Sequence, residues 1–184
     1  AVFGALLGTA ERWLSEKGMH RVRGPFNLTV NEECGLLVDG FDTPPSMMMG
    51  HARTYYADRL AQYGYIGAVD TLAYIMPPQY EAPAVMRKLV AYVKKRTVVR
   101  DLRRDRLDEE LAILRDIFND AWSENWGFVP FTEAEFAEIG RAMLHLADPD
   151  MVQIAEVAGR PAAMSVALPN LYGVIAGRGG RRRR

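Results

Sequence analysis

Apolar residues recur at two different spacings along this chain, and that alternation limits the fold to a mixture of helices and strands. Apolar positions three and four residues apart predict amphipathic helices, whereas short β-branched runs predict strands. The expected helices span about residues 3–14, 52–63, 83–93, 107–122 and 132–147. The expected strands span about residues 19–30, 65–76, 97–99, 151–157 and 162–168. The sequence therefore predicts an α/β fold with a mixed sheet.

Local signals fix several of these boundaries. The run from Pro77 to Pro83 interrupts both periodicities and predicts a linker, with Pro83 in the first turn of the next helix. Thr132 and Glu135 form a Thr-x-x-Glu capping box, which predicts the start of a helix. Residues 158–161 form a short turn between the last two expected strands, which predicts a hairpin.

Composition excludes several classes of site. The 184 residues include 23 basic and 23 acidic side chains, and removing the last four arginines leaves 19 basic residues and a net charge of −4. Cys34 is the single cysteine and the three histidines are scattered, so no disulfide framework and no metal site is expected. The positive charge belongs to the tail, and without a basic face or interleaved aromatic residues it does not favour nucleic acid as a partner.

Common catalytic and membrane signatures do not occur in this sequence. It contains no phosphate-binding glycine loop, no Gly-x-Ser-x-Gly elbow and no His-Glu-x-x-His motif. It also contains no apolar run near the ~18 residues of a membrane helix and no basic-then-apolar leader at its start. We therefore expect a cytoplasmic protein with no membrane partner.

Longer segments of the sequence resemble the GNAT superfamily of N-acetyltransferases. They resemble in particular uncharacterised bacterial proteins with two GNAT-like domains in tandem. The phrases that resemble the later part of such a domain are residues 21–27, residues 31–41, Pro44-Pro45, Tyr55-Tyr56 and Gly64-Tyr65. Residues 119–130, with Thr132 and Glu135, resemble the opening helices of a second domain.

The resemblance implies an incomplete or rearranged GNAT-like fold. Residues 1–78 correspond to the C-terminal half of one domain, and residues 96–176 correspond to the N-terminal half of the next. Residues 79–95 would then be a linker with a connecting helix, and residues 177–184 an Arg/Gly-rich disordered tail. The loop that binds the CoA pyrophosphate in this superfamily would lie upstream of Ala1, so no cofactor-binding residue is assigned.

The implied activity is transfer of an acetyl group from acetyl-CoA to an amine. A carboxylate that accepts a proton would be Glu32 or Glu33, although adjacent carboxylates in a loop are more often solvated. In many members a tyrosine four residues before a Gly-Phe pair protonates the leaving thiolate. Here Leu60 stands four residues before Gly64-Tyr65, and Tyr56 is a nearby candidate that packing alone could also explain.

The expected substrate-binding residues are those that the resemblance places near the acceptor: Asn31, Asn125, Trp126 and Phe128. The acceptor would be a small-molecule or peptide amine. Asn31 could equally cap a turn, and Trp126 could equally pack. Unpaired strand edges favour association into a homodimer. The alternative to an enzyme is a non-catalytic GNAT-like structural or interaction module.

Overall fold

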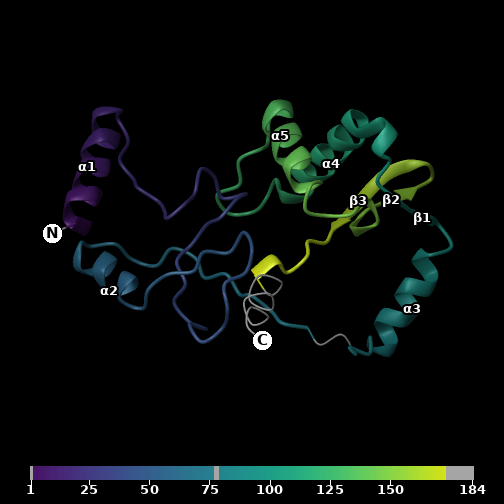
Figure 1. Cartoon of the computed structure of the whole chain (residues 1–184), viewed down its shortest axis with the longest axis horizontal. Coiled ribbons are helices and arrows are strands. Elements are labelled where there is room, and N and C mark those ends of the chain that lie inside the picture. The colour runs from purple at the N-terminus through teal and green to yellow at the C-terminus, as the bar shows by residue number, and fades with distance from the viewer. Residues whose placement is uncertain (1, 77–78, 173–184) are drawn as a thin grey trace, which may run out of the picture. The chain divides into compact units, whose positions relative to one another are not determined.

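The computed structural model describes residues 2–76 and 79–172, and the chain forms two compact units (Figure 1). Unit 1 comprises Ala1–Ala73 with Asn170–Arg184, and unit 2 comprises Tyr74–Pro169. The expected tail at residues 177–184 lies outside the described residues.

Unit 2 contains a three-stranded antiparallel sheet in the order β1-β2-β3, formed by Thr97–Asp101, Val152–Val157 and Arg160–Val166. Ala158 and Gly159 join β2 to β3 with φ of 52° and 73°. Two central residues with positive φ give a turn whose twist matches that of the strands. All three strands and the hairpin were predicted, and they are confirmed with shifted boundaries.

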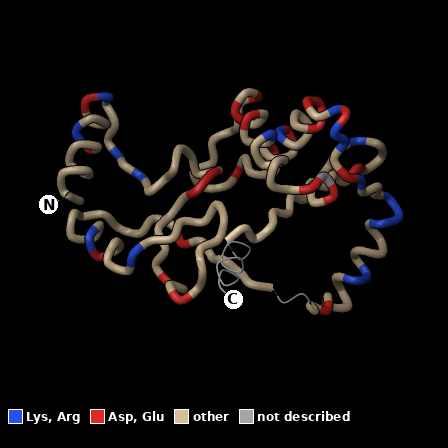
Figure 2. The backbone as a smooth tube through the Cα atoms, in the orientation of Figure 1, with Lys and Arg blue, Asp and Glu red and all other residues tan. Residues whose placement is uncertain are grey.

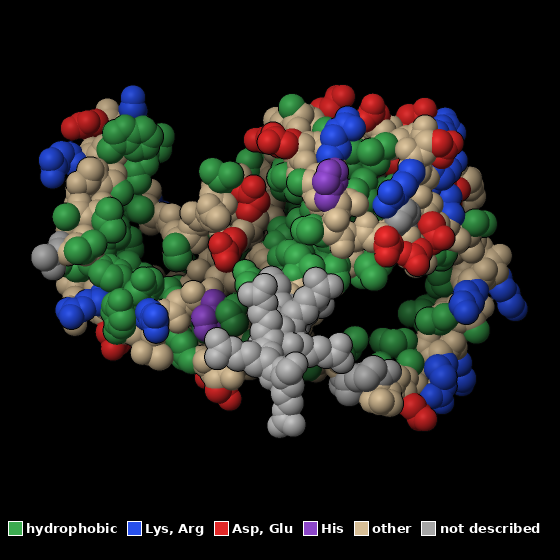
Figure 3. All heavy atoms as spheres, in the orientation of Figure 1, with side chains coloured by type: hydrophobic (Ala, Val, Ile, Leu, Met, Phe, Trp, Pro, Cys, Tyr) green, Lys and Arg blue, Asp and Glu red, His purple; other side chains and the backbone are tan. Residues whose placement is uncertain are grey.

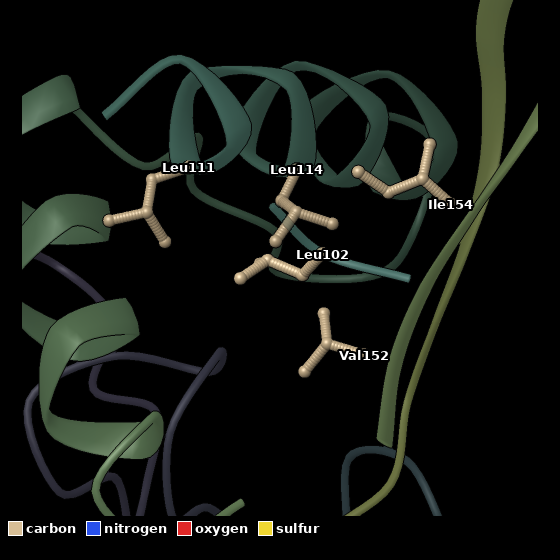
Figure 4. Close-up of a cluster of buried hydrophobic side chains, with 5 residues drawn as sticks. All are labelled: Leu102, Leu111, Leu114, Val152 and Ile154. Atoms are coloured by element: carbon tan, nitrogen blue, oxygen red, sulfur yellow. The ribbon is translucent and has the colours of Figure 1, made fainter. Parts of the chain in front are cut away.

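One helix covers this sheet, and a second helix packs against the first. They are α4, Leu107–Trp122, and α5, Glu133–Met143; a short 3-10 turn at Arg104–Arg106 precedes α4 and another at Pro149–Met151 precedes β2. The core consists of five buried side chains, shown in Figure 4: Leu102, Leu111, Leu114, Val152 and Ile154. These residues come from the position just after β1, from α4 and from β2, so the apolar stripe of α4 is buried against the sheet, as its spacing predicts.

The start of α5 confirms the predicted capping box. The Thr132 hydroxyl accepts a hydrogen bond from the Glu135 amide at 3.3 Å, and the Thr132 amide donates to Glu135 Oε2 at 2.9 Å. Farther along α5, Gly140 allows close contact with α4, because a Cβ there would lie 2.5 Å from Leu111 Cδ2.

A third helix of unit 2, α3, spans Ala84–Val93 with Pro83 as its N-cap residue. This confirms the helix predicted after the linker. None of its residues is buried.

Unit 1 contains two helices, α1 at Val2–Glu16 and α2 at Tyr55–Gln62. Gly18 and Gly64 follow them with φ of 77° and 83°, the left-handed conformation in which glycine commonly ends helices. Both helices confirm the sequence prediction. In Figure 3, green hydrophobic side chains are prominent over α1 and α2.

Two predicted strands are wrong. Residues 19–30 and 65–76 contain no strand, and only single bridges join Phe26 to Cys34 and Cys34 to Met49. A strand needs a continuous hydrogen-bonded neighbour, and β-branched composition alone does not supply one. Ile66 and Ile75 are consequently 90% and 89% exposed.

The predicted mixture of helices and strands is confirmed, but the sheet of the described residues is antiparallel and not mixed. Across residues 2–76 and 79–172, no helix is both long enough and apolar enough to cross a lipid bilayer.

Candidate functional site

Asn31, Glu32 and Glu33 lie together in a tight loop of unit 1. The Thr29 amide donates to Glu32 Oε2 at 3.1 Å, and the Asn31 amide donates to Thr29 Oγ1 at 3.2 Å. The base of the loop is closed by the Asn27 amide, which donates to the Glu33 carbonyl at 2.8 Å. The Glu32 carboxylate is thus used to stabilise its own turn, whereas the Glu33 residue is exposed. Of the two predicted carboxylates, Glu33 is the one more accessible to a substrate.

Tyr56 lies in the first turn of α2 and is half-buried. Its ring meets Phe3 of α1 edge-on, with centroids 5.2 Å apart, so the expected packing role is present. Tyr56 also lines a hollow of about 510 Å³ whose other lining residues are Phe41, His51, Ala52, Arg53 and Thr54. The tyrosine therefore packs against α1 and borders an open cavity at once.

His51 and Arg53 are the residues beside Tyr56 that sequence reasoning missed as site candidates. Both are exposed and line the same hollow. An imidazole can accept or donate a proton, and a guanidinium can bind an anionic group. The signal that could have found them is their position three and five residues before Tyr56, at the start of a predicted helix.

The remaining predicted residues, Asn125, Trp126 and Phe128, lie in the connection between α4 and α5 of unit 2. Trp126 is 44% exposed, and Phe128 is half-buried with its ring 6.0 Å from Phe118. The Asn119 side chain holds this connection, because its amide nitrogen donates to the Phe131 carbonyl at 3.0 Å and its oxygen accepts from the Phe131 amide at 2.9 Å. The connection is therefore a fixed surface.

Aromatic rings gather around that connection. Phe118 stacks on Trp122 with centroids 5.3 Å apart and also contacts three other phenylalanine rings. Those rings belong to Phe128, Phe131 and Phe136. Trp122 is 46% exposed, so the cluster is partly a surface, and it offers an apolar wall to a ligand.

A buried ion-pair network lies beside the core of unit 2. Glu110 is fully buried, and its carboxylate accepts from Arg100 Nη1 at 2.6 Å and from Arg103 Nη2 at 2.8 Å. Arg100 Nε also donates to Glu156 Oε1 at 2.6 Å. Glu110 was missed from the sequence, although its position in α4, three residues after Leu107 and four before Leu114, places it on the buried stripe.

Burial is the largest influence on Glu110 and by itself raises the pKa of that carboxyl. Hydrogen bonds from Arg100 and Arg103, with the charge of Arg100, outweigh burial and lower the pKa of Glu110 below its ordinary value. The same bonds to Glu110 and Glu156 raise the pKa of Arg100. Glu110 is therefore held ionised, and its role is structural.

A second hollow, of about 220 Å³, lies between α4 and α5. Charged residues at its rim are already paired: Arg141 with Asp108 at 2.5 Å, and Arg115 with Glu133 at 3.5 Å. Among the described residues, no three His, Cys, Asp or Glu side chains are placed to hold a metal ion.

Comparison with known proteins gives two curated relatives. The chain is 46% identical over 176 residues to Protein YghO of Escherichia coli (strain K12), covering 95% of this chain and 45% of that protein. It is 41% identical over 177 residues to the bacterial ceramide synthase of Caulobacter vibrioides (strain NA1000 / CB15N), covering 96% of this chain and 46% of that protein. The chain thus spans less than half the length of each relative. No family model matches the chain, and no solved structure matches it significantly.

Proposed function

We propose that this chain is part of an N-acyltransferase, which joins an acyl group from an acyl-CoA thioester to an amine. The observation that carries the proposal is the 41% identity over 177 residues to a protein named a bacterial ceramide synthase. A ceramide is a fatty acid in amide linkage to a long-chain amino alcohol, so its synthesis forms the bond that an N-acyltransferase makes.

The element order of unit 2 supports the same chemistry. A strand, two helices and an antiparallel pair of strands follow one another from β1 to β3. The resemblance to GNAT N-acetyltransferases implies this order for the first half of such a domain.

The proposed reaction is direct transfer. The amine nitrogen attacks the thioester carbonyl carbon, a C–N bond forms, the C–S bond breaks and CoA leaves as a thiolate. Glu33 is the proposed acceptor of the amine proton, because it is exposed whereas Glu32 is held by the Thr29 amide. Tyr56, beside the hollow of unit 1, is the proposed donor of a proton to the thiolate.

Unit 2, taken by itself, carries an aromatic surface that we propose as an apolar contact for a long-chain substrate. Trp126, Phe128 and the half-exposed Trp122 offer apolar area, and Asn125 adds a polar group near them in the sequence. This surface suits a lipid amine or a long acyl chain better than a small polar amine. We therefore propose a long-chain amino alcohol as acceptor and test both acetyl-CoA and a long-chain acyl-CoA as donors.

The test uses the longest gene product that contains this chain. It is incubated with sphinganine and either acetyl-CoA or palmitoyl-CoA, and the N-acylated product is measured by mass spectrometry. We expect amide formation that falls at least tenfold in Tyr56→Phe, because proton transfer contributes roughly 100- to 10,000-fold to such steps. Glu33→Gln is expected to fall similarly, with Glu32→Gln as the matched control.

Failure to form amide with either donor, in a protein that is folded by circular dichroism, would contradict the enzyme proposal. The alternative would then be a non-catalytic interaction module. The observation that favours this alternative is the absence of a buried side chain among the described residues of unit 1.

A further inference from the structure

Helix α3 separates apolar and basic side chains onto two sides. At 100° per residue, its apolar side chains fall within an arc of roughly 160°. They are Val85, Met86, Leu89, Val90, Tyr92 and Val93. The opposite side of the helix and its continuation carry Arg87, Lys88, Lys94 and Lys95. Between residues 84 and 96 no Asp or Glu occurs, and Figure 2 shows blue but no red along this helix.

The apolar side chains of α3 are exposed to solvent. Val85 is 79% exposed, Leu89 59% and Tyr92 57%. None of the ten residues of the helix is buried. An apolar helix face of this kind is normally covered when the protein works, because its exposure to water is unfavourable.

The basic side chains of this segment are not neutralised by carboxylates. None of the ion pairs found within the described residues involves a side chain between 84 and 96. Arg87 Nη1 donates to the Ala82 carbonyl at 2.7 Å, which secures the start of the helix. The Arg96 guanidinium lies 4.9 Å from the centre of the Tyr92 ring. The positive charge remains available to an anionic surface.

These properties match a phospholipid surface better than other occupants. A short helix with a wide apolar arc, whose opposite side carries Arg87 and Lys88 beside two small alanines and no acidic residue, lies in the plane of an anionic bilayer, with its apolar side among the acyl chains. Ten residues span about 15 Å, too little to cross the bilayer. Nucleic acid would attract the lysines but would leave the apolar arc exposed.

We propose that α3 is a membrane-surface helix that binds anionic phospholipid bilayers through its apolar arc and its flanking lysines and arginines. This replaces the sequence-based expectation of no membrane partner, which concerned membrane-spanning runs. The inference does not depend on the proposed enzyme activity, because its measurement is vesicle binding.

The experiment is co-sedimentation of the full chain with phosphatidylcholine vesicles that contain about 30% phosphatidylglycerol, or none. Wild-type chain is expected to bind the anionic vesicles and to lose most binding at about 1 M salt, where the Debye length is ~3 Å. Each basic residue near the surface contributes about fivefold, so Lys88→Glu with Lys95→Glu is expected to lower the partition coefficient at least 25-fold. Leu89→Gln with Val93→Gln is expected to lower it at least tenfold.

Matched variants separate α3 from other parts of the chain. Arg12→Glu with Lys17→Glu changes the net charge equally in unit 1, and Leu6→Gln with Leu72→Gln removes apolar side chains there that are more exposed than Leu89 and Val93. Both pairs are expected to change binding less than threefold. Arg181–Arg184 can also attract anionic lipid through charge, so every comparison is repeated in the full chain with these four arginines replaced by serine.

Two results would overturn the proposal. One is a wild-type chain that binds anionic vesicles no better than its Lys88→Glu, Lys95→Glu variant. The other is unchanged binding in the Leu89→Gln, Val93→Gln variant while the oligomeric state changes, which would show that protein covers this face instead of lipid. Circular dichroism checks that each variant keeps its helix content.

Discussion

Units 1 and 2 contain similar local elements but differ in what they bury. Unit 2 has a closed core of five apolar side chains between α4 and a three-stranded sheet. In the described residues of unit 1, α1 and α2 form without any buried side chain, and Leu72 is 75% exposed. The comparison teaches that helices follow from local pattern, whereas a core requires the apolar side of one element to pack on another, as α4 packs on the sheet in unit 2.

The largest expected loss of stability follows from removing the buried carboxylate of Glu110 in unit 2. Glu110→Ala leaves Arg100, whose side chain is only 17% exposed, without its buried partner. Breaking such a pair is expected to lower the free energy of unfolding of unit 2 by about 3–5 kcal/mol. Hydrogen exchange at the amides of β2 would measure this loss. Glu11→Ala is the matched change in unit 1, where the exposed carboxylate only accepts the Tyr65 hydroxyl at 2.8 Å. The opening free energy of α1, measured by hydrogen exchange, is expected to change by less than about 1 kcal/mol in this variant.

The same network predicts how unit 2 responds to pH. Because the pKa of Glu110 is lowered in the folded state, its stabilising contribution is present above the ordinary glutamate pKa of about 4.3. That contribution is lost as the pH falls below this value through the lowered pKa. Unfolding of unit 2 measured from pH 7 down to about pH 2 should therefore show a loss that is weaker in Glu110→Ala. An identical pH profile in both proteins would contradict the assignment.

Apolar truncation gives the next effect. Leu114 is 4% exposed in the core, and Leu114→Ala is expected to destabilise unit 2 by about 3 kcal/mol through lost burial and a cavity. Leu72→Ala in unit 1 should stay within about 0.5 kcal/mol. Urea denaturation, combined with hydrogen exchange at amides of each unit, measures the change in stability caused by each of the two substitutions. A large loss from Leu72→Ala would mean that unit 1 buries residues 65–76 in solution.

Helix caps give the smallest effect. Thr132 caps α5 through its side chain, so Thr132→Ala is expected to cost about 1 kcal/mol. Thr54 stands at the equivalent position of α2 but forms no side-chain cap hydrogen bond. Thr54→Ala should therefore change stability by less than about 0.3 kcal/mol. Thermal melts followed by circular dichroism distinguish these outcomes, and equal losses would show that α2 is capped in solution.

Much of unit 2 was predictable from its sequence. The stripe of α4, the capping box before α5 and the turn of the β2–β3 hairpin are all local signals, and each is present in the structure. The turn was expected over residues 158–161 and is shorter, because Arg160 and Pro161 already belong to β3. The expected strands 19–30 and 65–76 failed because the same β-branched composition forms a strand only beside a partner.

For the candidate site, too, some features were predicted from the sequence and others were visible only in the structure. Sequence reasoning grouped Asn31, Glu32 and Glu33, and the structure places them in one loop. It did not separate the two carboxylates, because the bond from the Thr29 amide to Glu32 depends on the fold of the turn. It also did not place His51 and Arg53 beside Tyr56, because a cavity is a property of packed elements.

By itself, the sequence determined where the helices lie, how α5 is capped and that basic and apolar residues divide along residues 84–96, because these depend on contacts within about four residues. Only the tertiary structure decided which β-branched runs became strands, that Glu110 is buried and paired with two arginines beside the core, and that the apolar side chains of α3 and of residues 65–76 are exposed. Each of these depends on which distant segment supplies a hydrogen bond, an opposite charge or an apolar surface.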